Sequence, residues 1–422
     1  MNNLNKKISI NVLMQELNIL STEIIRLRNK VKIKHKKTVF TKEEADKIRQ
    51  EFFKNQNTHT ESIREIKKMS KDLNIIYYGP AGTGKTKSAL DKVEELTSQN
   101  YDKDLFEKNK DELKELQEEF DEAKGRKATA LAKKIKTVEI SLSELEAEKK
   151  SFSEFTTFHP SYQYQEFIEG ISIENKDDSL SYKIKPGIFK KLAKRALENK
   201  DKNYVLIIDE INRGNISSIF GEFFTLLEDT KRVSSTEEEN PEAVSITLPY
   251  SQEQLSVPDN LYIIGTMNTT DKSISLLDVA LRRRFKFIAV EPNYSILKDI
   301  ESLEVSKMLQ SINERLSVLK GEDFQIGHSY FLNADSIKDL QEIFEFKIIP
   351  LLKEYFHGDW ESICAVLNQE YQSIGDNGLL INKFIVNENL FKNNQKFSEK
   401  VKKRKNCKLN FDFSIDDLKT II

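Results

Sequence analysis

Cysteine, histidine and long apolar runs are scarce in this 422-residue sequence, and each scarcity excludes a class of protein. Only Cys364 and Cys407 are present, too few for a disulfide framework or a cysteine-based zinc site. The five histidines do not show the HExxH spacing of many zinc enzymes. No apolar run approaches the roughly 18 residues of a membrane span, and the first ten residues are too polar for a secretory signal. We therefore expect a cytoplasmic protein without a membrane partner.

Charge is balanced overall but unevenly placed. The formal net charge is −2, yet residues 1–70 carry 16 Lys and Arg against 8 Asp and Glu. Within them, residues 26–37 (RLRNKVKIKHKK) would place most of their cations on one face if extended. Such a basic stripe could neutralise DNA phosphates without reading sequence. A solvated lysine-rich segment is at least as good an interpretation.

The most informative motif is GPAGTGKT at residues 79–86, directly after the apolar run 73–78. The run predicts a buried strand, and the motif fits GxxxxGK[ST], a loop whose backbone amides cradle phosphates at a helix N-terminus. Lys85 would reach the β- and γ-phosphates, and the Thr86 hydroxyl would bind Mg²⁺. A plain glycine-rich turn is the weaker alternative. The predicted nucleotide-binding residues are Gly79, Pro80, Ala81, Gly82, Thr83, Gly84, Lys85 and Thr86.

A second apolar run, residues 204–208, ends in the carboxylate pair Asp209 and Glu210, a Walker B pattern. Successive side chains of a strand point to opposite faces, so the two carboxylates can divide the work. We expect Asp209 to hold Mg²⁺ through water and Glu210 to polarise the attacking water. An acidic pair at the end of a strand is common by itself, but its position downstream of the phosphate loop favours the catalytic interpretation.

A third apolar run, within residues 260–267, leads to Asn268, where it would enter the crevice in which open α/β sheets bind ligands. Asn268 is expected to sense the γ-phosphate. Further along, ALRRRF ends a predicted helix with Arg282, Arg283 and Arg284. Arginines also suit the macrodipole at any helix C-terminus. The sharper hypothesis is an arginine finger that acts on a neighbouring subunit's nucleotide, which would imply a ring.

These blocks together resemble the McrB family of AAA+ proteins. The resemblance rests on IIDEINRGNISSIFGEFFTLLED, GTMNTTDKSISLLDVALRRRF, FHPSYQYQEFIEGI and FQIGHSYF, and it covers about two thirds of the chain. It implies a preference for GTP over ATP, a hexameric ring, and slow hydrolysis until an McrC-like nuclease subunit binds. Arg283 and Arg284 then match the family's intersubunit arginines, and Asn268 with Asp271 its NT-x-D signature. The usual NTAD reads NTTD here, a conservative change at Thr270.

Asp271 is a candidate for reading the base. A carboxylate can accept the N1–H and N2–H₂ donors of guanine as a pair, and adenine lacks that pair. Asp271 could equally cap a helix that starts at Ser273. GTP is therefore the first choice by resemblance, and ATP is not excluded.

Alternating strands and helices predict an α/β fold with a central parallel sheet. By resemblance it is an AAA+ P-loop NTPase, with the α/β domain over residues 71–292 and an α-helical lid over 293–357. Helical spacing predicts a small basic N-terminal helical module over 1–70, with one helix over 8–27. Two apolar stripes within 104–151 predict an inserted helical hairpin that turns near Gly125. Residues 358–422 are expected to form a small appended element.

The preferred hypothesis is thus the oligomeric GTP- or ATP-hydrolysing subunit of an McrBC-like restriction or phage-defence system. It would need Mg²⁺, engage DNA, and leave cutting to a separate nuclease subunit, because the chain carries no nuclease signature. The alternative is a MoxR-like ATPase that remodels protein complexes, and ATP-only hydrolysis would favour it. A nucleotide-gated scaffold without hydrolysis is disfavoured by Glu210 and Asn268. His159 and His328 are expected to be structural rather than catalytic.

Overall fold

The computed structural model describes residues 8–9, 39–40, 72–124, 126–176, 179–236, 240–270, 279–371, 374, 378–382, 407–410 and 412–422. The chain divides into two compact units, residues 1–72 and 73–422. In the first, β1 (Ile8–Ser9) pairs antiparallel with β2 (Val39–Phe40). The helix predicted to begin at Ile8 is therefore wrong at its first two residues, which form a strand instead. The rest of that helix and the basic stripe 26–37 lie outside the described residues.

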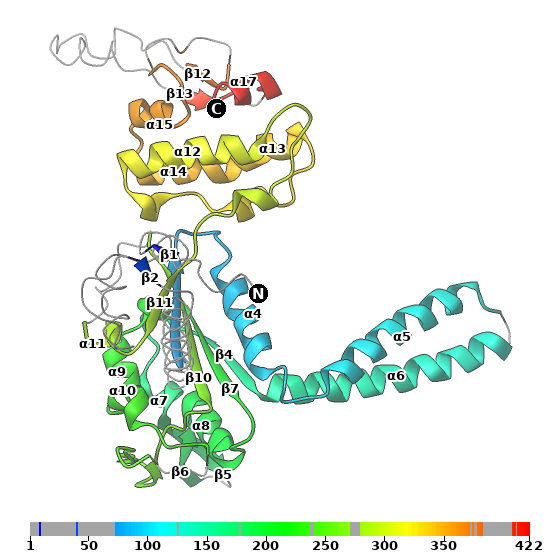
Figure 1. Ribbon diagram of the computed structural model, residues 1–422, viewed down its shortest axis with the longest axis vertical. Coiled ribbons are helices and arrows are strands. Elements are labelled where there is room, and N and C mark those ends of the chain that lie inside the picture. The colour runs from blue at the N-terminus through cyan, green and yellow to red at the C-terminus, as the bar shows by residue number, and fades with distance from the viewer. Residues whose placement is uncertain are drawn as a thin grey trace. The chain divides into compact units, whose positions relative to one another are not determined.

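A five-stranded sheet in the order β11-β3-β10-β7-β4 organises the second unit, and every pairing in it is parallel (Figure 1). Since parallel strands need crossover connections, the intervening helices must cover the faces of the sheet. All carboxyl ends then meet at one edge, where the predicted catalytic segments converge. The strands are β3 (Asn74–Gly79), β4 (Ser153–Thr157), β7 (Tyr204–Asp209), β10 (Leu261–Asn268) and β11 (Lys286–Ala289).

Alternation along β7 shows how the sheet is covered. Val205 and Ile207 pack with Ala89 of α4 (Lys85–Thr97), whereas Leu206 and Ile208 pack with the helices on the other face. All four are buried. This explains the unbroken apolar run in the sequence, because a strand covered on both faces has no side for polar residues. The opposite face is covered by α7 (Tyr164–Phe167), α8 (Ile188–Glu198), α9 (Ile216–Phe220) and α10 (Phe223–Leu226).

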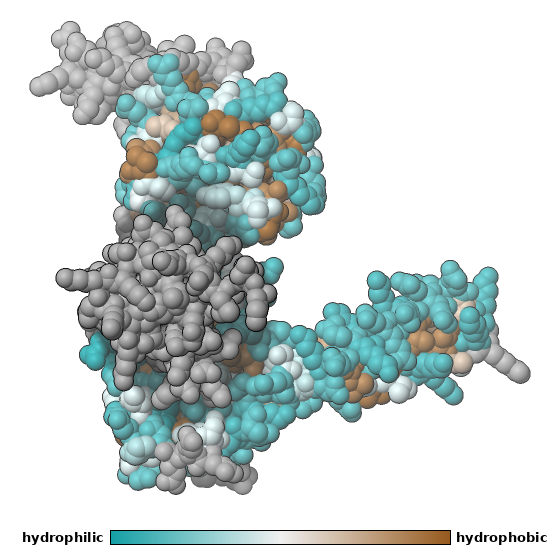
Figure 2. All heavy atoms as spheres, viewed as in Figure 1, coloured by the Kyte–Doolittle hydropathy of each residue, from teal (hydrophilic) through white to brown (hydrophobic). Residues whose placement is uncertain are grey.

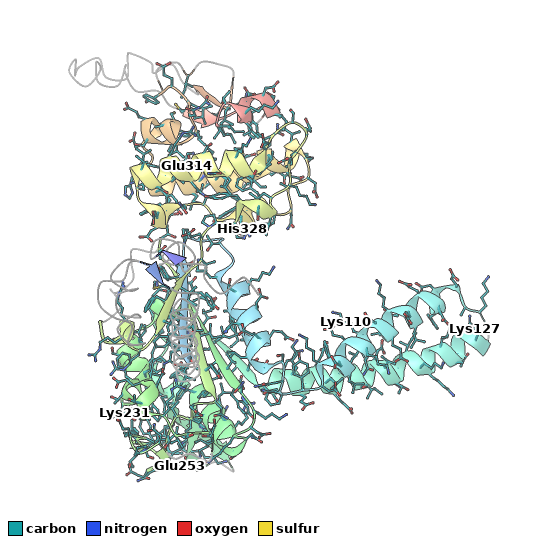
Figure 3. All side chains as sticks on the ribbon, viewed as in Figure 1. Lys110, Lys127, Lys231, Glu253, Glu314 and His328 are labelled. Atoms are coloured by element: carbon teal, nitrogen blue, oxygen red, sulfur yellow. The ribbon has the colours of Figure 1, made fainter. Side chains whose placement is uncertain are left out.

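The predicted helical insertion is confirmed: α5 (Lys103–Glu122) and α6 (Arg126–Ser151) leave the α/β body side by side (Figure 1). Their seam contains Leu116, Leu131, Val138 and Leu142. The surface around it is mainly hydrophilic in Figure 2, and Lys110 and Lys127 project from its two helices in Figure 3. We call α5 and α6 the helical hairpin.

Two β-hairpins lie close together on the α/β body. One is β5 (Glu169–Lys176) with β6 (Ser179–Pro186), and the other is β8 (Ile246–Thr247) with β9 (Gln254–Leu255). Glu169 of β5 links them, because it accepts from the N–H of Ser251, between β8 and β9, over 3.0 Å. The same carboxylate forms a buried ion pair with Lys190 of α8 over 2.6 Å. Burial opposes ionisation of Glu169, but these donors outweigh it and lower its pKa to about 2.

The C-terminal helices share one apolar core that extends from Leu297 to Ile421. The predicted lid and the predicted appended element therefore pack together, with no break in the core at residue 358. Among the described residues no helix is both long enough and apolar enough to cross a membrane. The elements are α12 (Val305–Leu319), α13 (Ile337–Ile343), a π-helical turn (Phe344–Ile348), α14 (Ile349–Tyr355), α15 (Trp360–Val366), β12 (Leu380–Asn382), β13 (Cys407–Leu409) and α17 (Ile415–Lys419).

Candidate nucleotide-binding site

The predicted phosphate loop connects β3 to α4, the strand-loop-helix setting that its motif requires. Gly82 and Gly84 have φ of 78° and 85°, backbone conformations that glycine adopts without strain. The Lys85 ammonium is buried and donates to the carbonyls of Gly79 (3.0 Å) and Pro80 (2.6 Å). The loop therefore presents its amides at the first turn of α4, with the lysine folded against it.

Thr86 and Asp209 meet at the carboxyl edge of the sheet. The Thr86 hydroxyl donates to Asp209 Oδ1 over 3.3 Å, and the Thr266 hydroxyl of β10 donates to the same oxygen over 2.5 Å. A hydroxyl beside a carboxylate offers the hard oxygen donors that Mg²⁺ prefers, with phosphate and water completing the coordination. Among the described residues no cluster of three or more His, Cys, Asp or Glu could hold a metal by itself. The pair thus fits a magnesium ion held jointly with a nucleotide.

Glu210 and Asn268 are in direct contact, as the side-chain amide of Asn268 donates to Glu210 Oε1. Glu210 has a φ of 53°, an uncommon conformation for a residue with a side chain. Its other oxygen pairs with Arg213 Nε over 3.2 Å, and Asn212 donates to the Asn268 carbonyl over 3.1 Å. Residues from the ends of β7 and β10 therefore form one polar cluster. It could orient a water near a terminal phosphate.

The GHSYF segment, residues 327–331, lies directly against the phosphate loop. The Gly327 N–H donates to the Ala81 carbonyl (3.2 Å), and the Ser329 N–H donates to the Gly82 carbonyl (3.1 Å). A Cβ on Gly327 would lie 2.0 Å from the Gly82 carbonyl carbon, so only glycine permits this approach. This segment of the C-terminal core thus supports the phosphate loop through two backbone hydrogen bonds.

His328, in the same segment, was expected to be structural, and its Nδ1 does accept the Asn293 N–H over 3.0 Å (Figure 3). Its Nε2 is 3.8 Å from the Cβ position of Gly84, beside the loop. Burial lowers the pKa of His328, and nearby Lys87 lowers it further. A neutral ring that accepts at Nδ1 carries its proton on Nε2. His159, in contrast, is exposed and packs edge-on against Tyr162.

The arginines lie at the other end of the sheet from the phosphate loop. Asn74, the first residue of β3, donates to the Arg284 carbonyl over 2.9 Å. The loop follows Gly79, five residues later, or about 16 Å along a strand. The Arg284 side chain pairs with Glu228 over 2.6 Å and stacks on Phe224. Arg283 is exposed and makes no ion pair with any described residue.

The structure therefore brings Lys85, Thr86, Asp209, Glu210 and Asn268 together and holds Arg283 and Arg284 apart from them. Asp271 lies outside the described residues, so its proposed contact with a base has no geometry here. The separation of the arginines is what a finger acting between subunits requires, because it could not reach its own phosphate site.

A phosphate loop on a parallel sheet, with an acidic strand end and a helical lid, defines an AAA+ protein. Residues 137–285 match the AAA domain of the dynein-related subfamily, and residues 304–364 match the α-helical lid domain of McrB. The AAA match begins within α6, after the phosphate loop. These matches show an AAA+ protein whose lid domain is of the McrB type.

Two relatives extend these matches. The chain is 39% identical over 225 residues to the type IV methyl-directed restriction enzyme EcoKMcrB subunit of Escherichia coli, covering 48% of this chain and 46% of that protein. It is 28% identical over 237 residues to YdiS, a component of the type II restriction enzyme BsuMI of Bacillus subtilis, covering 47% of this chain and 68% of that one. The chain thus spans less than half the length of the first relative, and both relatives are restriction proteins.

Proposed function

We propose that this chain is a GTP-hydrolysing ring subunit that powers a restriction or phage-defence system and leaves DNA cutting to a separate McrC-like nuclease. The contact between Glu210 and Asn268, beside Asp209 and Thr86, carries the proposal. These groups form the hydrolytic half of a phosphoryl-transfer site. The names of the two restriction relatives support this biological setting. The proposal includes DNA as the object of the motor and the cytoplasm as its location.

Each group has a separate role in hydrolysis. Lys85 would turn from its own loop carbonyls to the β- and γ-phosphates. Thr86 and Asp209 would hold Mg²⁺, which would supply positive charge to neutralise the phosphates. Asn268 fixes the Glu210 carboxylate, and Glu210 orients the attacking water. Arg283 of one subunit reaches the γ-phosphate bound by its neighbour. Arg284, held by Glu228 and Phe224, sets the position of Arg283.

The decisive experiment compares turnover of GTP and ATP by the wild type and the Glu210→Gln variant, with and without an McrC-like partner and DNA. We expect GTP turnover by the wild type and a fall of about 10²- to 10⁴-fold in the variant, with nucleotide binding retained. Sedimentation should show assembly of both proteins when nucleotide saturates them. ATP-only turnover would favour a MoxR-like remodelling function instead, and an undiminished rate in the variant would refute the role of Glu210.

A further inference from the structure

A cavity of 380 Å³ opens where the phosphate loop begins. Its size is within the range of small-molecule sites, which start at roughly 300 Å³. Three segments far apart in sequence form it: the end of β3 with the start of the loop, the residues that follow β11, and the turn after α12. The lining residues are Tyr78, Gly79, Pro80, Ala289, Val290, Glu291, Pro292, Tyr294, Glu322, Asp323 and Gln325.

The order of the strands determines on which side of Asp209, Glu210 and Asn268 this cavity lies. β3 lies between β11 on one side and β10 on the other, and β7 lies beyond β10. The cavity opens on the β11 side of the phosphate loop, whereas Asp209, Glu210 and Asn268 lie on the β10 and β7 side. A nucleoside triphosphate that follows the phosphate loop with its γ-phosphate near Glu210 would therefore direct its base toward the cavity.

The chemistry of the lining suits a purine. Tyr78, Val290, Pro292 and Tyr294 supply flat or apolar walls. Glu322 and Asp323 belong to a short 3₁₀ turn after Gly321, are exposed at the cavity, and form no ion pair with any described residue. Two free carboxylates are acceptors only. They complement the N1–H and N2–H₂ donors of guanine, while adenine opposes them with the lone pair of its N1.

We infer that this cavity is the base site and that Glu322 and Asp323 select guanine over adenine. The inference deepens the proposed function and rests on it. It assigns the selectivity for the base to a turn of the lid and not to Asp271. This turn lies on the opposite side of the phosphate loop from Asn268. Base identity is thereby read by the same C-terminal unit that supports the phosphate loop through Gly327 and Ser329.

The test measures dissociation constants for the β,γ-imido analogues of GTP, ATP and ITP by calorimetry, so that hydrolysis does not interfere. The variants are Glu322→Gln, Asp323→Asn and the two combined. An amide can accept from the adenine amino group and donate to adenine N1, so it suits adenine where a carboxylate does not. The matched control is Glu314→Gln with Asp299→Asn, two exposed carboxylates outside the cavity (Figure 3 labels Glu314).

We expect the wild type to bind the GTP analogue best, the ITP analogue less well because inosine lacks the 2-amino group, and the ATP analogue least. In the combined variant the preference for GTP over ATP should fall by at least about tenfold through weaker GTP binding, since tenfold corresponds to one modest interaction. The control variant should keep the wild-type preference.

The outcomes separate the two claims. If the wild type binds no triphosphate, the proposed function itself fails. If the wild type prefers ATP, the proposed GTP-hydrolysing function fails together with the inference. If the wild type prefers GTP and the combined variant binds nucleotide with unchanged selectivity, the base-site inference is overturned while the proposed function stands. A thermal melt of each variant shows whether it is folded, and the single variants test the inference if the combined one is not.

Discussion

The α/β unit and the helical hairpin bury their apolar residues to different degrees. Val205, Leu206 and Ile208 of β7 are fully buried between two layers of helices, whereas Val138 and Leu142 of the hairpin each retain 9% of their exposure. Two helices bury apolar residues only where they face each other. A sheet covered by helices on both faces buries the apolar residues of both faces. A rigid core can hold catalytic groups within hydrogen-bonding distance. The hairpin is attached to the α/β unit only near its base, and beyond that its described buried residues pack within its own seam.

The comparison predicts that substitutions in the α/β unit change the chemistry and that substitutions in the hairpin spare it. The largest effect should come from Arg283→Ala, with turnover falling about 10³- to 10⁵-fold because the transition-state charge loses its partner. Nucleotide binding should persist, since Arg283 lies at the other end of the sheet from its own phosphate loop. Steady-state hydrolysis and nucleotide titration measure the two effects.

Mixing the Arg283→Ala variant with a Lys85→Ala variant tests whether the finger acts between subunits. A mixed ring contains interfaces that combine an intact phosphate site with an intact arginine, so the mixture should recover part of the wild-type rate. Arg282→Ala is the matched control, because that side chain packs over Phe287 of its own chain. No recovery in mixed rings, shown to form by sedimentation, would contradict a finger acting in trans.

The buried pair of Glu169 and Lys190 should produce the next largest effect, on stability. Lys190→Met leaves the Glu169 carboxylate buried without its cation, which costs about 3 to 5 kcal/mol. Chemical denaturation measures the loss. The double variant with Glu169→Gln removes both charges and should lose less. Equal losses in the single and double variants would show that the ion pair is unimportant.

The same pair predicts the acid response of the unit. The folded pKa of Glu169 is about 2, below the ordinary value of 4.5. A depressed pKa contributes stability that is fully present above pH 4.5 and is lost as the pH falls toward 2. Denaturation midpoints of the wild type should therefore fall across this window, and those of the double variant should fall less. Parallel curves would contradict the low pKa.

Leu142→Ala tests the hairpin seam and should cost about 2 to 3 kcal/mol, since a buried leucine leaves a cavity when truncated. The loss should be local, so hydrogen exchange should rise across α5 and α6 while nucleotide binding stays unchanged. Ile140→Ala is the matched control, because Ile140 is 52% exposed and its truncation should change stability by less than about 0.5 kcal/mol. Weakened nucleotide binding in Leu142→Ala would contradict the prediction that substitutions in the hairpin spare the nucleotide site.

The smallest effect is expected at the attachment of the hairpin. Lys149 of α6 pairs with Glu94 of the phosphate-loop helix α4 over 2.5 Å, and Tyr101 donates to the same carboxylate over 2.6 Å. Both charged side chains are about one third exposed, so Lys149→Met should cost no more than about 1 kcal/mol. Lys150→Met is the control in thermal unfolding, because Lys150 pairs with Glu146 of its own helix and not with α4 among the described residues.

The hydrolytic cluster and the parallel sheet were predictable because each motif directly follows an apolar strand, and parallel strands end at one edge. The hairpin was predictable from helical spacing on both sides of Gly125. The pair of Glu169 and Lys190 was not, since 21 residues separate them and no local pattern requires their contact. The base cavity was equally hidden, because folding alone brings its three segments together.

Arg232 is another residue whose environment could not be predicted from the sequence. It is fully buried and donates to the carbonyls of Pro258 and Leu261 and to Asn74 Oδ1, and burial lowers its pKa to about 10. An isolated arginine in a sequence predicts surface exposure. Only folding brings Asn74 and the segment from Pro258 to Leu261 to its two terminal nitrogens, while its buried Nε finds no acceptor among the described residues.

Glu94, Tyr101 and Lys149 form a junction between α4 and the base of the helical hairpin. A rotation at this junction would displace the far end of the hairpin by a larger distance than its base. α4 starts at the phosphate-binding lysine, and the junction attaches this helix to the base of α6, whose 26 residues extend about 39 Å at 1.5 Å per residue. A 5° rotation at the junction would carry the far end of α6 through an arc of about 3 Å on this geometry. A small rotation of α4 would thereby be amplified at the tip of the hairpin.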